Sequence, residues 1–67
     1  MVDISGLIGK VARGPRVYKN IEDYSISGTV MGAYIVSETE GTYLRLVLLL
    51  KDKSLSDIDH RKATILD

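Results

Sequence analysis

Hydrophobic and polar residues alternate with a period of two through the middle of the chain. Positions 24, 26, 28 and 30 carry Tyr24, Ile26, Gly28 and Val30, and Ser or Thr fills the positions between them. This period predicts a half-buried strand, which continues through the β-favouring residues 33–36. Glycine inside a strand marks a bend, a bulge or a close backbone approach, and we expect this at Gly28 and Gly32. A bulge at Gly32 would exchange the two faces, so the pattern leaves open which face of residues 33–36 is buried.

A second strand is predicted after a short polar loop. Residues 37–41 are polar and end in Gly41, which is typical of a hairpin. In the return strand, residues 42–50, one face carries Thr42 and four leucines, and the other carries Tyr43, Arg45, Val47 and Leu49. A strand that is apolar on both sides needs cover on both sides. We therefore predict that Tyr43, Arg45, Val47 and Leu49 form an interface between copies of this chain.

The two ends of the chain predict shorter elements. Residues 7–12 are expected to form a short strand, which Gly14 and Pro15 end within residues 13–16. Pairing is expected to resume briefly over residues 17–18. Near the C-terminus, Ser56 is a candidate N-cap with Asp59 three residues later, so one helical turn is expected within residues 54–60. Residues 63–66 then form a closing strand. The predicted fold is mainly β, an SH3-like or Sm-like small barrel of about five strands with one short helical turn before the last.

Two segments carry a resemblance to known small barrels. Residues 55–58 leading into residues 62–66 resemble the closing turn and strand of Sm-like barrels, such as the C-terminal domain of the ribosome maturation factor family. The step from Gly28 to Val30 is similar to the bend in the second strand of such barrels. The resemblance implies a fold and transfers no function. The basic N-terminal segment differs from an Sm core, which normally begins with a helix.

Length and composition narrow the class of protein. Sixty-seven residues make a single domain, residues 1–67. The absence of Cys excludes disulfides and thiolate metal sites, and a lone His cannot build an imidazole-rich site, so we expect no metal or cofactor. A domain this small has a low free energy of unfolding, which favours a homo-oligomer. The longest apolar run is five residues, residues 46–50, whereas a membrane helix needs roughly 20. With no visible signal peptide, the expected location is the cytoplasm.

Charge is balanced in total and uneven in order. The first 20 residues hold four Lys or Arg and one Asp, whereas residues 21–42 hold four acidic residues and no basic one. This order suits a solvated surface, and it also suits a positive edge of one subunit set against a negative edge of another. The basic segment suggests an alternative function, a modest-affinity RNA- or DNA-binding barrel. Its candidate contacts are Lys10, Arg13, Arg16, Tyr18 and Lys19. A pI near 6.5 disfavours this alternative.

Catalytic chemistry has few candidates. His60 is the only side chain with an ordinary pKa near neutrality, and Asp57, Asp59, Ser54 and Ser56 lie near it in sequence. Neighbours in sequence seldom converge as a triad requires, and a chain of this size has little room for a water-excluding pocket. We therefore expect no enzyme. The favoured function is a self-associating, non-catalytic accessory or regulatory module that binds another macromolecule.

Overall fold

A computed structural model describes residues 5–18 and 21–66 of the chain, with side chains for residues 5–16 and 24–66. The described part is mainly β, and its strands pair antiparallel. The elements are β1 (Val11–Tyr18), β2 (Ile21–Glu38), β3 (Gly41–Leu49), β4 (Leu55–Asp59), the 3₁₀ turn η1 (His60–Lys62) and β5 (Thr64–Ile65). This confirms the prediction of five strands with one helical turn before the last.

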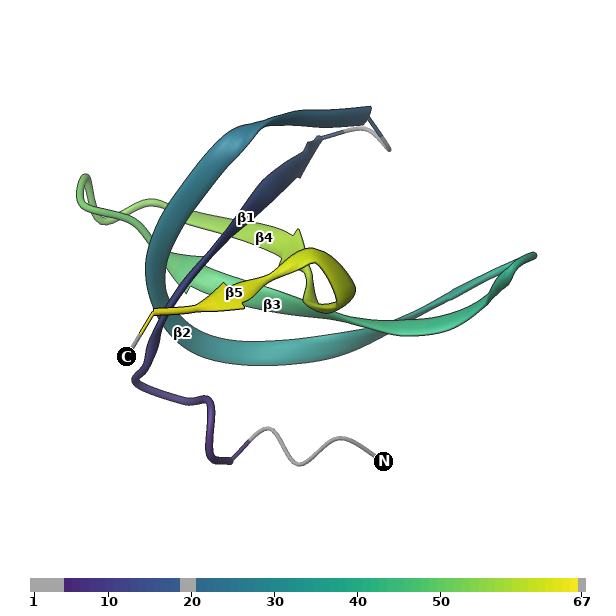
Figure 1. Cartoon of the computed structure of the whole chain (residues 1–67), viewed down its shortest axis with the longest axis horizontal. Helices are drawn as coiled ribbons and strands as arrows, with labels where there is room; N and C mark the ends of the chain where they lie inside the picture. Colours follow the sequence, from purple (N-terminus) through teal and green to yellow (C-terminus); the bar gives the residue numbers. More distant parts are fainter. Residues whose placement is uncertain (1–4, 19–20, 67) are drawn as a thin grey trace.

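Strand β2 is long and pairs with two partners. Its first half pairs with β1 and its second half with β3, so Thr29 is in register with both Val11 and Leu49. The ribbon curves through this point from one partner to the other (Figure 1). At Gly28 an added Cβ would lie 2.5 Å from the Leu49 carbonyl oxygen. The absence of a side chain at Gly28 therefore lets the bent strand approach the end of β3, as the sequence predicts for a glycine inside a strand.

A register shift in β2 decides which residues of its second half are buried. Val30 pairs with Leu48 and Gly32 pairs with Val47, so Met31 is the extra residue of a bulge. Val30 is fully buried, Met31 is 53% exposed, and Ala33 packs against the core. The inward positions therefore change from even to odd numbers at Met31. This settles the question that the sequence pattern leaves open.

The core lies between these strands and is small. The residues that are buried in it are Ala12, Ile26, Val30, Leu46, Leu48 and Ile58. Every strand except β5 contributes to it, and Leu7, Ala33, Leu50 and Ala63 pack around it. Leu46 and Leu48 are fully buried, which agrees with the predicted inward face of β3.

The prediction for the N-terminal region is wrong in two places. Residues 5–9 form turns, and two backbone hydrogen bonds lead into β1, which begins only at Val11: Gly9 N–H donates to the Val30 carbonyl and Val30 N–H donates to the Lys10 carbonyl. Strand β1 then continues through Gly14 and Pro15, where a break was predicted. Pro15 is in register with Ser25, beside a register shift in the ladder. Proline is tolerated at such an irregularity, because a ladder hydrogen bond is missing there anyway.

The predicted helical turn is displaced along the chain. Residues 55–59 form β4, and η1 begins only after them. Asp59, not Ser56, is the N-cap, and its carboxylate accepts the backbone N–H of Arg61. The closing strand is also shorter than predicted, because β5 contains only Thr64 and Ile65. Pairing of β4 with β3 has overridden the local capping signal.

Candidate interaction surface

The side chains that alternate with buried Leu46 and Leu48 on β3 lie on the side away from the core. Strand pairing places residues of the adjacent strands beside them. Tyr34 of β2 and Asp59 of β4 lie on either side of Arg45, and Leu55 of β4 lies beside Leu49. Residues that pair in adjacent strands point to the same face of a sheet. The outer face, as we name this surface, comprises Tyr34, Tyr43, Arg45, Val47, Leu49, Leu55, Asp57 and Asp59.

Arg45 holds one half of the outer face together. Its Nη2 donates to the Tyr43 hydroxyl at 3.0 Å, and its Nη1 lies 3.7 Å from Asp57 Oδ2. The Tyr34 hydroxyl donates to the same Asp57 oxygen, which links β2 to β4 across β3. The Arg45 side chain is only 15% exposed. Two of its three nitrogens thus have partners within the chain, while the buried Nε–H has no acceptor among the described residues.

These contacts shift the pKa values of the groups involved. Burial, together with the hydrogen bond to Asp57, raises the pKa of the Tyr34 phenol above its ordinary value. Hydrogen bonding with Tyr34 and Tyr43 raises the pKa of Arg45, and partial burial opposes this rise. Tyr34 is therefore a neutral donor at neutral pH and Arg45 a fixed cation.

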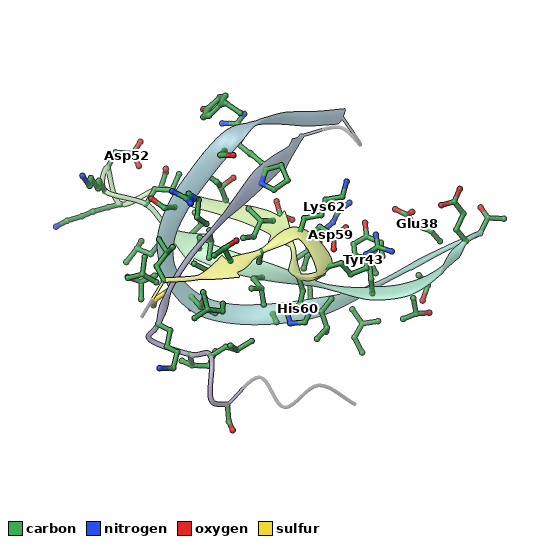
Figure 2. All side chains as sticks on the ribbon, viewed as in Figure 1. Glu38, Tyr43, Asp52, Asp59, His60 and Lys62 are labelled. Atoms are coloured by element: carbon green, nitrogen blue, oxygen red, sulfur yellow. The ribbon has the colours of Figure 1, made fainter. Side chains whose placement is uncertain are left out.

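A second arginine, Arg61, lies at the edge of the half of the outer face that contains Arg45. Arg61 of η1 binds the Asp59 carboxylate with its Nη2 at 2.7 Å and its Nε at 3.1 Å. The Arg61 guanidinium carbon lies 4.0 Å from the centroid of the Tyr43 ring, and the Tyr43 hydroxyl donates to Glu38 at 3.1 Å. Figure 2 shows Glu38, Tyr43 and Asp59 on the same side of the molecule. The charges of this half are paired within the chain.

The other half of the outer face is apolar and partly exposed. Val47 and Leu49 are half-buried, and Leu55 is 64% exposed. Two shallow hollows border Leu49 and its neighbours. One, of about 210 Å³, is lined by Tyr34, Val47, Leu55, Ser56 and Asp57, and the other, of about 300 Å³, by Val11, Ser27, Gly28, Thr29, Leu49, Leu50 and Lys51. The predicted interface residues thus lie on one surface, of which the half at Val47 and Leu49 is apolar.

The sequence prediction missed four members of this surface, Tyr34, Leu55, Asp57 and Asp59. Tyr34 follows the bulge, so its face could not be assigned before the register was known. Leu55, Asp57 and Asp59 lie within the predicted helical turn, whereas β4 places them in register with Leu49, Val47 and Arg45. The alternation of residues 55–59 was the available signal, because Leu55, Asp57 and Asp59 recur with a period of two.

The predicted nucleic-acid residues do not share one face of β1. Arg13 is exposed between buried Ala12 and Gly14, whereas Arg16 is in register with buried Ile58. Arg16 donates to the Tyr24 hydroxyl at 3.1 Å and lies 5.4 Å from its ring centroid. Lys10 is half-buried just before the strand. The Tyr18 side chain and Lys19 lie outside the described residues, so this interface stays a prediction.

The groups considered for catalysis are dispersed. His60 is half-buried at the start of η1, whereas the Ser54 hydroxyl and N–H both bind Asp52 in the turn after β3. Within residues 5–18 and 21–66, no group of three or more His, Cys, Asp or Glu side chains could hold a metal ion. The same residues include no helix long and apolar enough to cross a membrane.

Comparison of the chain with protein-family models, with curated protein sequences and with solved structures finds no match in any of the three. A functional assignment therefore depends on the geometry of the outer face.

Proposed function

We propose that this protein is a small, SH3-like β-barrel that acts as a non-catalytic interaction module. In this proposal it self-associates through the outer face and, as an accessory or regulatory protein, binds another macromolecule. One observation carries the proposal. Strand β3 has fully buried leucines on its inner side, and on its other side half-buried Val47 and Leu49 continue into exposed Leu55.

The strand pairings support the barrel. Strand β1 pairs with β2, β2 with β3 and β3 with β4, and the pair Arg16 and Ile58 connects β4 back to β1. The pairings thus return to their starting strand, which is how a small barrel removes sheet edges. The buried residues come from these four strands.

The small core and the paired charges of the outer face support self-association. The core has six buried residues among those that the structure describes, which leaves so short a chain with little stability of its own, and burial of further apolar area against a partner would add to it. Asp57 and Asp59 already have arginine partners, so covering this face leaves few unpaired charges. A standard interface takes about 800 Å² per partner, about a sixth of the 4662 Å² surface of the chain.

The test replaces single residues at the centre of the apolar half. We expect the parent protein to be a discrete oligomer in sedimentation and native mass spectrometry. Val47→Lys and Leu49→Lys should each raise the dissociation constant at least about 100-fold, because an unpaired charge buried in an interface opposes association by several kcal/mol. Circular dichroism of each variant establishes that the chain remains folded.

A matched control lies on the same hairpin. Ile35 is 64% exposed and points to the face opposite Tyr34, so Ile35→Lys should leave the oligomer unchanged. A parent protein that stays monomeric at about 100 μM, or folded Lys variants that associate like the parent, would refute the proposal.

A further inference from the structure

The two ends of the outer face carry opposite charge. Lys51 lines the hollow beside Leu49, and Lys53 follows it in the same turn. The intervening Asp52 is exposed, and its carboxylate accepts both the N–H and the hydroxyl of Ser54, so this turn carries two cations against one anion. At the other end of β3, the tip of the β2–β3 hairpin carries Glu38 and Glu40 and no basic residue. Figure 2 shows Glu38 and Asp52 at opposite ends of the molecule.

We infer that the occupant of the outer face is a second copy of this chain, seated face to face with its β3 running antiparallel, so that the Lys51 end of each copy meets the Glu38 and Glu40 tip of the other. This inference rests on the proposed function and adds the identity and orientation of the partner.

Symmetry and charge together select this arrangement. Two identical faces that pack on each other are related by a two-fold axis in the plane of the interface. An axis parallel to β3 would set Lys51 near the partner's Lys51 and Glu40 near the partner's Glu40. An axis that runs across the strands instead sets Lys51 near the partner's Glu38 and Glu40. Like charges placed opposite each other disfavour an interface, so the second axis is the favoured one.

The positions of the side chains along β3 indicate where this axis crosses the strand. An axis between Arg45 and Val47 sets Leu49 opposite the partner's Tyr43, so that an aliphatic side chain meets an aromatic ring. It also sets Lys51 opposite the partner's Gly41, which pairs with Glu38 and directly follows Glu40.

The same axis sets Asp57 opposite the partner's Asp59. Each of these carboxylates has a partner within its own chain, since Asp57 contacts Arg45 and Asp59 contacts Arg61. Their mutual repulsion is therefore reduced.

Charge reversal tests the orientation. In sedimentation equilibrium at about 50 mM salt, Glu40→Lys and Lys51→Glu should each raise the dissociation constant about 3- to 10-fold, because each contact occurs twice in the dimer. The chain that carries both changes should return to within about twofold of the parent, since it restores an attractive pair. The differences in dissociation constant between the single variants and the parent should shrink at about 0.5 M salt, because screening weakens the charge contacts.

A control separates local pairing from net charge. Glu40→Lys combined with Arg13→Glu has the same net charge as the rescued chain, but Arg13 is an exposed residue of β1 beside Thr64 of β5. It should therefore dimerise as weakly as Glu40→Lys alone. A rescued chain that associates no better than this control would overturn the inference.

Cross-linking reports the orientation directly, because the chain contains no cysteine. A 1:1 mixture of Glu40→Cys and Lys51→Cys, treated with a bis-maleimide of about 10 Å reach, should give mainly the mixed dimer. Mainly Glu40→Cys homodimers would show the parallel arrangement and refute the inference. If Val47→Lys dissociates the dimer while both charge tests fail, the orientation is wrong and the proposed function stands. If the parent is monomeric, both fail.

Discussion

At the scale of single residues, Asp59 connects a strand end, a helical turn and the aromatic cluster. It is 6% exposed, its carboxylate caps η1 through the Arg61 N–H at 2.9 Å, and it binds the Arg61 guanidinium. Arg61 in turn lies over the Tyr43 ring. The hydrogen bond with the Arg61 side chain is the main reason that the pKa of Asp59 lies below its ordinary value, and partial burial opposes this shift.

A pH-dependent contribution to stability follows from this shift. The folded-state pKa is lowered, so at acidic pH the unfolded chain binds more protons, and stability falls as the pH drops from about 4 through the folded pKa of Asp59. Asp59→Asn should lower the free energy of unfolding by about 1–2 kcal/mol at pH 7 and by less at pH 2. Urea unfolding between pH 2 and 7 measures this. Exposed Glu40→Gln should stay within about 0.5 kcal/mol of the parent at pH 7. An Asp59→Asn variant whose deficit is as large at pH 2 as at pH 7 contradicts the assignment.

At the scale of elements, β2 determines the arrangement of the sheet. Its bend at Gly28 lets one strand pair with β1 and then β3, and its bulge at Met31 turns Tyr34 to the outer face. Gly28 and Gly32 differ sharply in their surroundings. An added Cβ would meet the Leu49 backbone at the first position and no atom within 4 Å at the second.

This difference predicts unequal effects of the same substitution. Gly28→Ala should lower the free energy of unfolding by about 1–3 kcal/mol, because the backbone of β3 must move to admit the methyl group. Gly32→Ala should raise it by about 0.4–1 kcal/mol, since alanine restricts the unfolded chain and fits in the folded one. Urea unfolding of the two variants, studied below the dissociation constant, measures both. Equal stabilities would contradict the close approach at Gly28.

At the scale of the whole molecule, a small core lies behind the outer face, and one half of that face is apolar. Strands β2, β3 and β4 present that face away from the core residues. A domain of this size gains stability from association in proportion to the apolar area that a partner covers.

Association through this face predicts that stability depends on concentration. The melting temperature of the parent should rise as the protein concentration increases from about 1 to 100 μM, because only the folded chain binds its partner. Val47→Lys should melt at one temperature throughout this range, and Ile35→Lys should follow the parent. Differential scanning fluorimetry measures all three proteins. A parent whose melting temperature is constant while Val47→Lys melts at the same value would argue against the interface.

Local pattern accounts for the elements that were predicted correctly. The alternation around Ile26 and Val30 and the polar loop ending in Gly41 predict the β2–β3 hairpin, and the face of Leu46 and Leu48 is buried as expected. The missed elements are those in which pairing overrides a local signal. Pro15 predicts a strand break but lies inside β1, and Ser56 predicts a helix N-cap but lies inside β4.

The sequence by itself determined that β3 carries apolar side chains on both sides, interrupted on one side by Arg45, and that Tyr43, Arg45, Val47 and Leu49 share one face, because side chains alternate along any extended strand. Only the tertiary structure decided that Tyr34, Asp57 and Asp59 surround Arg45 and pair the charges of one half of that face. Those residues are more than ten positions from Arg45 in the sequence. Their proximity depends on the bulge at Met31 and on the register of β4, which the packing of the core sets and no local pattern contains.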